Sequence, residues 1–478
     1  MLTERRASFA GDALVVVVAK LLVSGLVWAS GFRAVSDDDF ARVVLAQAWA
    51  EAPRLDPTGT SWLPLPFWVT GGAMRLAGNT SLGFARGVAV ALGLVSAVLV
   101  LGAARLLVRD RRAALIGALL ACAFPWSARL GVAPVPELPT AALSVFAVAT
   151  LVSSSGRMRV AGGFALLLAV WSRYEPWPLA LAFVALQVLP GFGVPRSSVR
   201  SRVLSCGLAL FGPFAWLLHN KLAHGDALHF LARVSAYKRA LGGDDPSAVA
   251  AYPLALLREE PELWLVALAA LALSRGSGLR SLRAPVCALG AMVLALSLAA
   301  SRGGAPTHHN GRALLAVWLA LAIVVGAQLD AVLRRPGAAR LGLAAVIFAV
   351  VPFGAFVLRP WYARLDSMAD REVETRIGAR TRALVDRGPV LLEVRDFGFF
   401  AIQAGSGSPG MFVLDRILDP RDPTRGSSFR DAASLRERLE TSGARYILAT
   451  ETPAALVLGE PLFGFGPWRL WSCSSAPP

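Results

Sequence analysis

Long apolar segments constrain the fold of this chain more than any other feature of its sequence. A helix that crosses a bilayer needs about 20 mostly apolar residues. The clear candidates are Leu14–Ser30, Ser81–Val108, Ala113–Ser127, Pro139–Val152, Val203–Asn220, Ala284–Ser301, Ala313–Leu333 and Leu341–Leu358. Shorter or interrupted candidates are Val160–Trp171, Trp177–Phe192 and Leu263–Ser274. The sequence therefore predicts a polytopic α-helical membrane protein with about 11 transmembrane helices.

Charged residues are scarce and unevenly placed. They make up 17% of the chain, against about 25% in an average soluble domain. The net charge of +16 would suggest nucleic acid in a soluble protein. Here most arginines lie in short connections between apolar segments, where they set the orientation of the helices. We therefore expect the lipid bilayer as a partner, and no nucleic acid.

The basic connections predict which side of the membrane each loop faces. Short loops rich in arginine are cytoplasmic by the positive-inside rule, as is the Arg5–Arg6 end. These loops hold Arg105, Arg109, Arg111, Arg112, Arg157, Arg159, Arg196, Arg200, Arg202, Arg275, Arg280, Arg283, Arg334, Arg335 and Arg340. The uncertain segments within 160–192 have basic loops on both sides, so they must go out and return. The chain is expected in the cell (plasma) membrane, with a cytoplasmic N-terminus and acid-rich loops outside.

The composition changes after Leu358, where a soluble unit is expected. Helical spacing over Asp370–Asp386 and Ser434–Thr441 alternates with strand-like Val390–Val394, Met411–Leu414 and Tyr446–Ala449. An odd number of spans places this unit outside. We predict a transmembrane domain over 1–360, with a large first outer loop at 31–80, and a small extracytoplasmic α/β domain over 361–478. No glycine-rich nucleotide motif is present.

Three consecutive acids, Asp37, Asp38 and Asp39, follow the first predicted helix. One interpretation is a capping box, in which Ser36 begins a helix and Asp39 occupies its third position. A cap does not require three like charges, however, and each raises the pKa of the others. Such a cluster suits a general base, or a site for a divalent cation such as Mg²⁺ or Mn²⁺ at Asp38 and Asp39.

Two further outer-loop residues have both a structural and a functional interpretation. Trp62 could stack on a sugar or a prenyl chain, while the nearby Trp68 is better explained as an interfacial anchor. Glu137 lies among prolines and could cap the following helix, or contact the substrate if its loop folds over the acidic triplet.

Arginine and histidine motifs occur in later loops. Arg173, Tyr174 and Glu175 could form a neutral ion pair or a phosphate site, because the arginine fork matches phosphate geometry. His308, His309 and Arg312 are interpreted as substrate or phosphate contacts in preference to a metal site. The remaining histidines, His219, His224 and His229, are scattered and expected to be ordinary loop residues.

The order of these motifs resembles the GT-C glycosyltransferases, in particular the protein mannosyltransferase-like and dolichyl-phosphate-mannose-dependent members. The acidic pair of that family looks like Asp38-Asp39-Phe40 here, and its Arg-Tyr-Glu turn looks like Arg173-Tyr174-Glu175. The resemblance implies a hexosyltransferase that moves a sugar from a polyprenyl-phosphate donor to a protein, lipid or polysaccharide acceptor. The present chain has three acids where the family commonly shows two.

The resemblance also implies roles for the candidate residues. Asp38 would deprotonate the acceptor, while Asp39 or Asp37 would orient the acceptor or a divalent cation. Arg173 and Arg312 would stabilise the departing phosphate. A secondary transporter and a non-catalytic lipid-binding or lipid-flipping protein are the alternatives. Transporters usually show internal repeats and midplane charges, whereas this sequence has no evident repeat and gathers its acids on one face.

Overall fold

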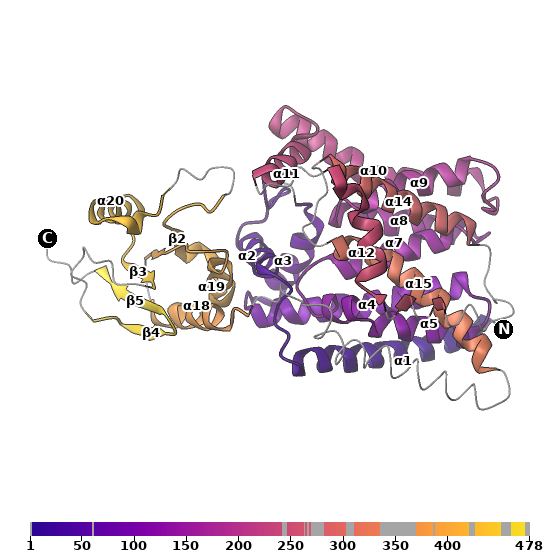
Figure 1. The fold of residues 1–478 in the computed structure, drawn as a ribbon, viewed down its shortest axis with the longest axis horizontal. Coiled ribbons are helices and arrows are strands. Elements are labelled where there is room, and N and C mark those ends of the chain that lie inside the picture. Colours follow the sequence, from indigo (N-terminus) through magenta and orange to yellow (C-terminus); the bar gives the residue numbers. More distant parts are fainter. Residues whose placement is uncertain are drawn as a thin grey trace.

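The computed structural model describes residues 2–59, 62–240, 246–261, 263–264, 267–268, 282–302, 310–334, 370–385, 388–419, 426–450 and 460–473. A bundle of helices forms one part, and a small α/β domain lies at one end of its long axis (Figure 1). The N-terminus lies at the other end of the bundle. The predicted fold class, a polytopic helical membrane protein with a C-terminal α/β domain, is confirmed.

The bundle consists of α1 (Leu2–Ala29), α4 (Leu82–Leu107), α5 (Arg111–Ala123), α7 (Glu137–Thr150), α8 (Gly156–Ser172), α9 (Pro176–Val188), α10 (Val199–His224), α14 (Arg283–Ser301) and α15 (Asn310–Leu333). Each overlaps a predicted span. Among the described residues, α1, α4, α10, α14 and α15 are long and apolar enough to cross a membrane alone. The predicted spans Leu263–Ser274 and Leu341–Leu358 lie mostly and wholly outside the described residues, respectively.

Small residues allow the inner helices of the bundle to approach closely. A Cβ atom added to Gly326 of α15 would lie 2.2 Å from the backbone nitrogen of Gly117 in α5. Backbone contact of this kind is typical of helices packed within a membrane, where burial of apolar surface gives no driving force between helices. Of the five candidate spans, α15 is the most enclosed.

The predicted span Ala113–Ser127 is wrong at its end, because α5 stops at Ala123. Phe124 adopts an extended conformation (ψ 149°), as a residue before proline prefers. Pro125 then opens a separate short helix, α6 (Pro125–Leu130). The buried Lys20 of α1 holds this helix, donating from Nζ to the carbonyl oxygen of Ser127 at 2.7 Å. The interruption at Phe124 therefore separates α5 from the short helix that precedes α7, the helix that begins at Glu137.

Several short helices cover the end of the bundle that faces the C-terminal domain. Helices α2 (Asp37–Glu51) and α3 (Leu65–Ala77) lie between bundle and domain (Figure 1). Pro64 precedes α3, and Pro66 occupies its first turn, where a missing N–H costs nothing. The remaining short elements are α11 (His229–Ala240), η1 (Pro246–Ala250) and α12 (Ala251–Arg258).

The C-terminal domain contains a five-stranded sheet in the order β2-β1-β3-β5-β4. Parallel pairing joins β1 (Val390–Leu392) to β2 (Phe412–Leu414) and β3 (Tyr446–Ala449), and antiparallel pairing joins β5 (Trp468–Ser472) to β3 and β4 (Phe463–Phe465). Its helices are α18 (Glu372–Leu384), α19 (Phe399–Ser406) and α20 (Ala432–Ser442), with turns η3 (Pro409–Met411) and η4 (Ser428–Arg430). The predicted strands and helices are confirmed, whereas α19 and the β4–β5 hairpin were not predicted.

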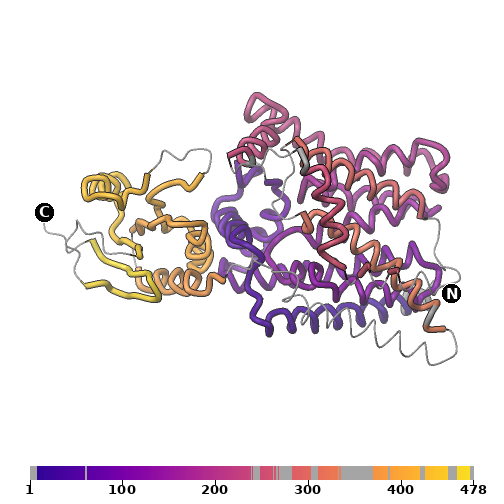
Figure 2. Tube along the Cα trace, viewed as in Figure 1, coloured from indigo at the N-terminus to yellow at the C-terminus, as the bar shows by residue number. Residues whose placement is uncertain are grey.

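The two parts of the protein meet at α2 and α19, which lie side by side where the indigo and orange segments meet in Figure 2. Gln47 of α2 donates from its amide to the carbonyl oxygen of Ala404 in α19 at 2.9 Å. Phe40, Met74 and Ala401 form a shared buried cluster with Ala404. The helix that begins with the acidic triplet is therefore packed between the bundle and the C-terminal domain.

Candidate active site

Asp39 is the buried member of the acidic triplet. Its side chain accepts hydrogen bonds from the backbone N–H groups of Val35 (3.1 Å) and Ser36 (3.2 Å), the carboxylate half of a capping box. Only 1% of the residue is exposed. Burial raises the pKa of Asp39 to about 7, against the opposing effects of Arg312 and of the two N–H donors. The capping interpretation is thus correct for Asp39.

Asp37 is engaged by the C-terminal domain. Arg371 donates from Nε to Oδ1 at 2.9 Å and from Nη2 to Oδ2 at 3.0 Å, so both oxygens of the carboxylate are bound. This two-point geometry is the strong form of an arginine–carboxylate contact. Asp37 is consequently fixed in place by a residue far from it in sequence.

Asp38 is the accessible acid of the three. Half of its side chain is exposed (50%), and its carboxylate makes no hydrogen bond with the residues that the structure describes. The nearest cation is Arg312, whose Nη1 lies 3.9 Å from Oδ2. The three acids therefore have different surroundings. Asp37 binds the C-terminal domain, Asp39 caps the N-terminus of α2, and Asp38 faces the neighbouring arginines.

Glu137 lies at the centre of a buried ionic network. Its Oε1 lies 2.7 Å from Nη1 of Arg173 and 2.5 Å from Nη2 of Arg312. Arg173 also donates from Nε to Glu175 at 2.9 Å. These side chains come from α7, α15 and the turn between α8 and α9, so the fold brings three sequence-predicted loops together. Each of the four is at least 89% buried, with Arg173 at 11% the most exposed side chain.

Arg42 completes the group of cations and was missed by the sequence analysis. It lies one turn after Asp38 in α2 and is 8% exposed. Its guanidinium carbon lies 4.4 Å from the centroid of the Trp62 ring, and its Nε has no hydrogen-bond partner among the described residues. Burial lowers the pKa of Arg42, and the nearby Glu137 opposes that effect. A buried guanidinium with an unpaired N–H is a candidate for binding an anionic ligand.

An apolar cavity of about 220 Å³ adjoins this network. Arg42 lines it, as do Pro136 and Ser172, the neighbours of Glu137 and Arg173. The other walls come from α2, α3, α4, α7 and α8, through Val43, Leu65, Pro66, Phe67, Val69, Thr70, Ala85, Ala89, Leu92, Val95, Ser96, Leu99, Pro134, Val135, Pro139, Leu143 and Leu168. Val69 and Val95 are exposed on the surface of the bundle. The cavity therefore has a charged inner end and an apolar wall that reaches the surface.

The predicted aromatic contacts have structural partners. Trp62 packs against Arg42 and stacks on Phe67 with ring centroids 6.1 Å apart. Tyr174 stacks on Phe230 at 4.7 Å, and its hydroxyl accepts a hydrogen bond from Trp216 Nε1 at 3.0 Å. Trp62 thus packs beside Arg42 of the cavity wall, whereas Tyr174 belongs to a separate aromatic cluster with Trp216 and Phe230. The predicted contacts His308 and His309 lie outside the described residues.

The predicted divalent-cation site at Asp38 and Asp39 does not fit the donor set. Each oxygen of Asp39 accepts a backbone N–H bond, and only 1% of the residue is exposed, so the carboxylate is enclosed by the start of α2. Asp38 faces Arg312. Arg42 and Arg173 also lie close enough to interact electrostatically with Asp38. A divalent cation would meet several fixed positive charges there. The arrangement instead favours an anionic ligand.

Comparisons with solved structures show that this chain shares the fold of ArnT and AglB. No protein-family model matches the sequence, and no curated protein matches it. ArnT from Cupriavidus metallidurans bound to undecaprenyl phosphate is similar in structure, with a TM-score of 0.59, 16% identity and coverage of 100% of both chains. ArnT in the apo state gives 0.58, 14% identity and 98% coverage of both chains.

A second protein of known structure shares the fold. AglB, an oligosaccharyltransferase from Archaeoglobus fulgidus in complex with an inhibitory peptide and a dolichol-phosphate, has a TM-score of 0.51 at 14% identity. The match covers 91% of this chain and 69% of AglB. These likenesses show the fold and a multi-pass membrane architecture.

Proposed function

We propose that this protein is a membrane glycosyltransferase that transfers a sugar from a polyprenyl-phosphate-linked donor to an acceptor outside the cytoplasm. One observation carries the proposal: buried Arg42 lies at the charged end of an apolar cavity whose wall reaches the bundle surface. A lipid phosphate has this combination of an anionic head and an apolar chain. ArnT and AglB, which share the fold, are known in complex with undecaprenyl phosphate and a dolichol-phosphate, respectively.

The cavity suits part of a polyprenyl chain. Its 220 Å³ lies below the roughly 300–1,000 Å³ of a pocket that encloses a whole small molecule. The units next to the phosphate would lie between α3 and α4, and the rest of the chain would extend into the bilayer past Val69 and Val95. Arg42, Arg173 and Arg312 would then face the phosphate, which they are suited to bind by their planar donor forks.

Asp38 is the proposed general base. It is half exposed, and its carboxylate is not held by hydrogen bonds from the described residues. It would take the proton of the acceptor hydroxyl or amine as that group attacks the anomeric carbon. The bond from the anomeric carbon to the phosphate oxygen breaks, and the lipid phosphate leaves with the electron pair. A single in-line displacement inverts the configuration at that carbon.

The arginines would stabilise the leaving group. Charge develops on the phosphate oxygen as the bond breaks, and cations fixed in a buried site stabilise it without rearranging. Glu137 holds Arg173 and Arg312 in place, so it is a positioning residue. The proposal assigns a hexose as the sugar, with mannose as one candidate, and a protein, lipid or polysaccharide as the acceptor.

The topology suggests the cell membrane with the acceptor side outside. The N-terminus and the C-terminal domain lie at opposite ends of the bundle (Figure 1), which accords with a cytoplasmic N-terminus and an extracytoplasmic domain. The ionic network lies near the end of the bundle covered by α2. A secondary transporter would be expected to hold its charges near the bilayer midplane, so the enzyme is favoured.

A lipid-binding or lipid-flipping protein would use the same cavity, so the decisive experiment must measure sugar transfer. Full-length protein in proteoliposomes is given radiolabelled polyprenyl-phosphate hexose, with host membrane extract as the acceptor source. Release of free polyprenyl phosphate and transfer of label are followed together. We expect Asp38→Asn to reduce both by at least about 100-fold, the lower range of general acid–base catalysis.

Glu51→Gln is the matched control, because Glu51 is an exposed acid at the far end of the same helix. It should leave transfer unchanged. Equal rates for Asp38→Asn and the wild type would overturn the assignment of the base. Tight lipid binding without transfer by the wild type would favour the lipid-binding alternative.

A further inference from the structure

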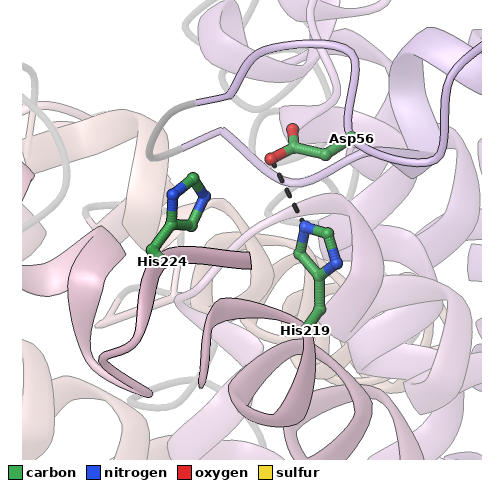
Figure 3. A group of neighbouring side chains, drawn as sticks. All are labelled: Asp56, His219 and His224. Carbon is green, nitrogen blue, oxygen red and sulfur yellow. Dashed lines mark ion pairs between the residues drawn. The ribbon is translucent and has the colours of Figure 1, made fainter. Parts of the chain in front are cut away.

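A second polar cluster lies beside an aromatic group of the outer loops. Asp56 comes from the loop between α2 and α3, while His219 and His224 come from the last turns of α10 (Figure 3). One ligand atom from each residue lies within 4.8 Å of the other two. Asp56 Oδ2 lies 3.6 Å from His219 Nε2. No role in the proposed sugar transfer accounts for this cluster.

The Asp56 carboxylate is oriented by its own loop. Oδ1 accepts hydrogen bonds from the backbone N–H groups of Thr58 (3.1 Å) and Gly59 (3.0 Å). Oδ2 is left on the side of His219, as the dashed line in Figure 3 shows. Backbone donors that hold one carboxylate oxygen and leave the other for a ligand are typical of the outer shell of a metal site.

The imidazole of His219 is held in a similar way. Its ring stacks on Trp216, with centroids 5.1 Å apart and planes 26° from parallel. Nε2 is buried and has no hydrogen-bond partner among the described residues, since 3.6 Å is too long for one. A buried imidazole nitrogen without a partner, facing a carboxylate, is a position that a bound ligand would satisfy.

We propose that Asp56, His219 and His224 bind a zinc ion, with water as the fourth ligand. Two imidazoles and a carboxylate are a donor set that zinc accepts, whereas calcium and magnesium prefer oxygen ligands alone. Zinc bonds of about 2.1 Å in a tetrahedron hold ligand atoms about 3.4 Å apart. Asp56 and His219 already have that spacing. His224 is exposed, so its side chain can move the remaining distance.

The zinc ion would fasten the outer loop to the bundle. Asp56 belongs to the segment that leads from α2 to Trp62, and Trp216 beside His219 donates its hydrogen bond to Tyr174. The ion would therefore connect the loop that follows α2, the helix of Asp38, with α10, whose Trp216 contacts Tyr174 next to Arg173. Its function is structural, and it does not depend on whether the protein transfers sugar.

Metal content and stability test the proposal on the full-length protein, purified with a tag free of histidine. Wild-type protein exposed to equimolar zinc and then dialysed should retain about one zinc per chain. Cobalt in place of zinc should give the visible absorption of a tetrahedral site. Asp56→Asn, His219→Gln and His224→Gln should each weaken zinc binding at least tenfold, and chelation should lower the melting temperature of the wild type alone.

His229→Gln is the matched control, because His229 stacks on His224 at 4.1 Å but does not belong to the cluster. It should bind zinc as the wild type does. Failure of the wild type to retain zinc, or an equal loss in His229→Gln and His224→Gln, would overturn the proposal. Variants that elute as monodisperse protein and still lose zinc exclude misfolding as the cause.

Discussion

Arg371 binds both carboxylate oxygens of Asp37, the residue next to the proposed base (Nε–Oδ1 2.9 Å, Nη2–Oδ2 3.0 Å). Arg371 precedes α18 of the C-terminal domain and also contacts Asp396 at 3.2 Å. The hydrogen bonds to Asp37 raise the pKa of Arg371 above its ordinary value. The C-terminal domain thus reaches the first turn of the helix on which Asp38 lies.

Loss of this contact should slow transfer without abolishing it. In Arg371→Ala we expect the transfer rate to fall roughly 10- to 100-fold, because small displacements of a catalytic group are costly. Arg371→Lys should rescue little, since an ammonium group cannot bind both oxygens. Rates in proteoliposomes and hydrogen exchange of α2 would measure the effect.

Arg376 provides the control, because it forms an exposed pair with Glu372 on the same helix. Arg376→Ala should keep the wild-type rate, as exposed ion pairs contribute little. Equal rates in the two alanine variants would show that the C-terminal domain does not position the triplet.

Asp39 should make the stability of the protein depend on pH. Its pKa is about 7 in the folded protein, against an ordinary value of 3.8. The unfolded chain releases this proton at lower pH than the folded protein does. The contribution of Asp39 to the free energy of unfolding is therefore complete below about pH 4 and is lost as the pH rises to about 7. At about 1.4 kcal/mol for each pKa unit, the difference between the two pKa values corresponds to a change of about 4 kcal/mol in the free energy of unfolding.

Asp39→Asn should remove this dependence. The melting temperature of the wild type, minus that of the variant, is expected to fall between pH 5 and pH 8. The subtraction cancels the other titrating groups that the two proteins share. A difference that stays constant or grows with pH would contradict the raised pKa of Asp39.

Arg42 should contribute to lipid-phosphate binding. Arg42→Leu removes a buried cation from the cavity wall, and a hydrogen bond to a charged group is worth about 1.5–3 kcal/mol. We expect the Kd for polyprenyl phosphate to rise roughly 10- to 100-fold. Arg75→Leu on α3 is the control, because Arg75 bonds to the carbonyl oxygen of Ala50 and does not line the cavity. Similar Kd values for both variants would rule out Arg42 as a phosphate contact.

A larger side chain in the cavity should exclude the lipid. Ala89 of α4 lines the cavity and is 8% exposed. Ala89→Phe is expected to raise the KM for the donor roughly tenfold, with a smaller effect on kcat, because it fills space that the prenyl chain would use. Ala91→Phe places the same ring on the exposed face of the same helix and should leave KM unchanged. An unaltered KM in Ala89→Phe would show that the prenyl chain binds to another surface.

Local patterns predicted the helices and part of the site. The apolar segments coincide with the described helices because their length is dictated by the bilayer. Asp39 as a cap followed from its spacing to Ser36, and the break before Pro125 was available from the restriction that proline imposes on Phe124. Each of these depends on a few neighbouring residues.

The division of the acidic triplet depended on distant partners. Nothing near Asp37 in sequence indicates Arg371, and nothing near Arg42 indicates that it packs on Trp62. His219 and His224 are five positions apart, which is not the spacing of a helical metal pair. They meet Asp56 only because α10 ends beside the first outer loop. Contacts of this kind follow from the fold and not from sequence spacing.

The contact between Asp37 and Arg371 joins residues 334 positions apart. During synthesis, the N-terminal part of this contact is made long before its partner. When the helical bundle has been synthesised, Arg371 has not yet been made, so the carboxylate of Asp37 still lacks this partner. The surroundings of the acidic triplet are therefore completed only once Arg371 has been made, and a product truncated before Arg371 would lack the partner of Asp37.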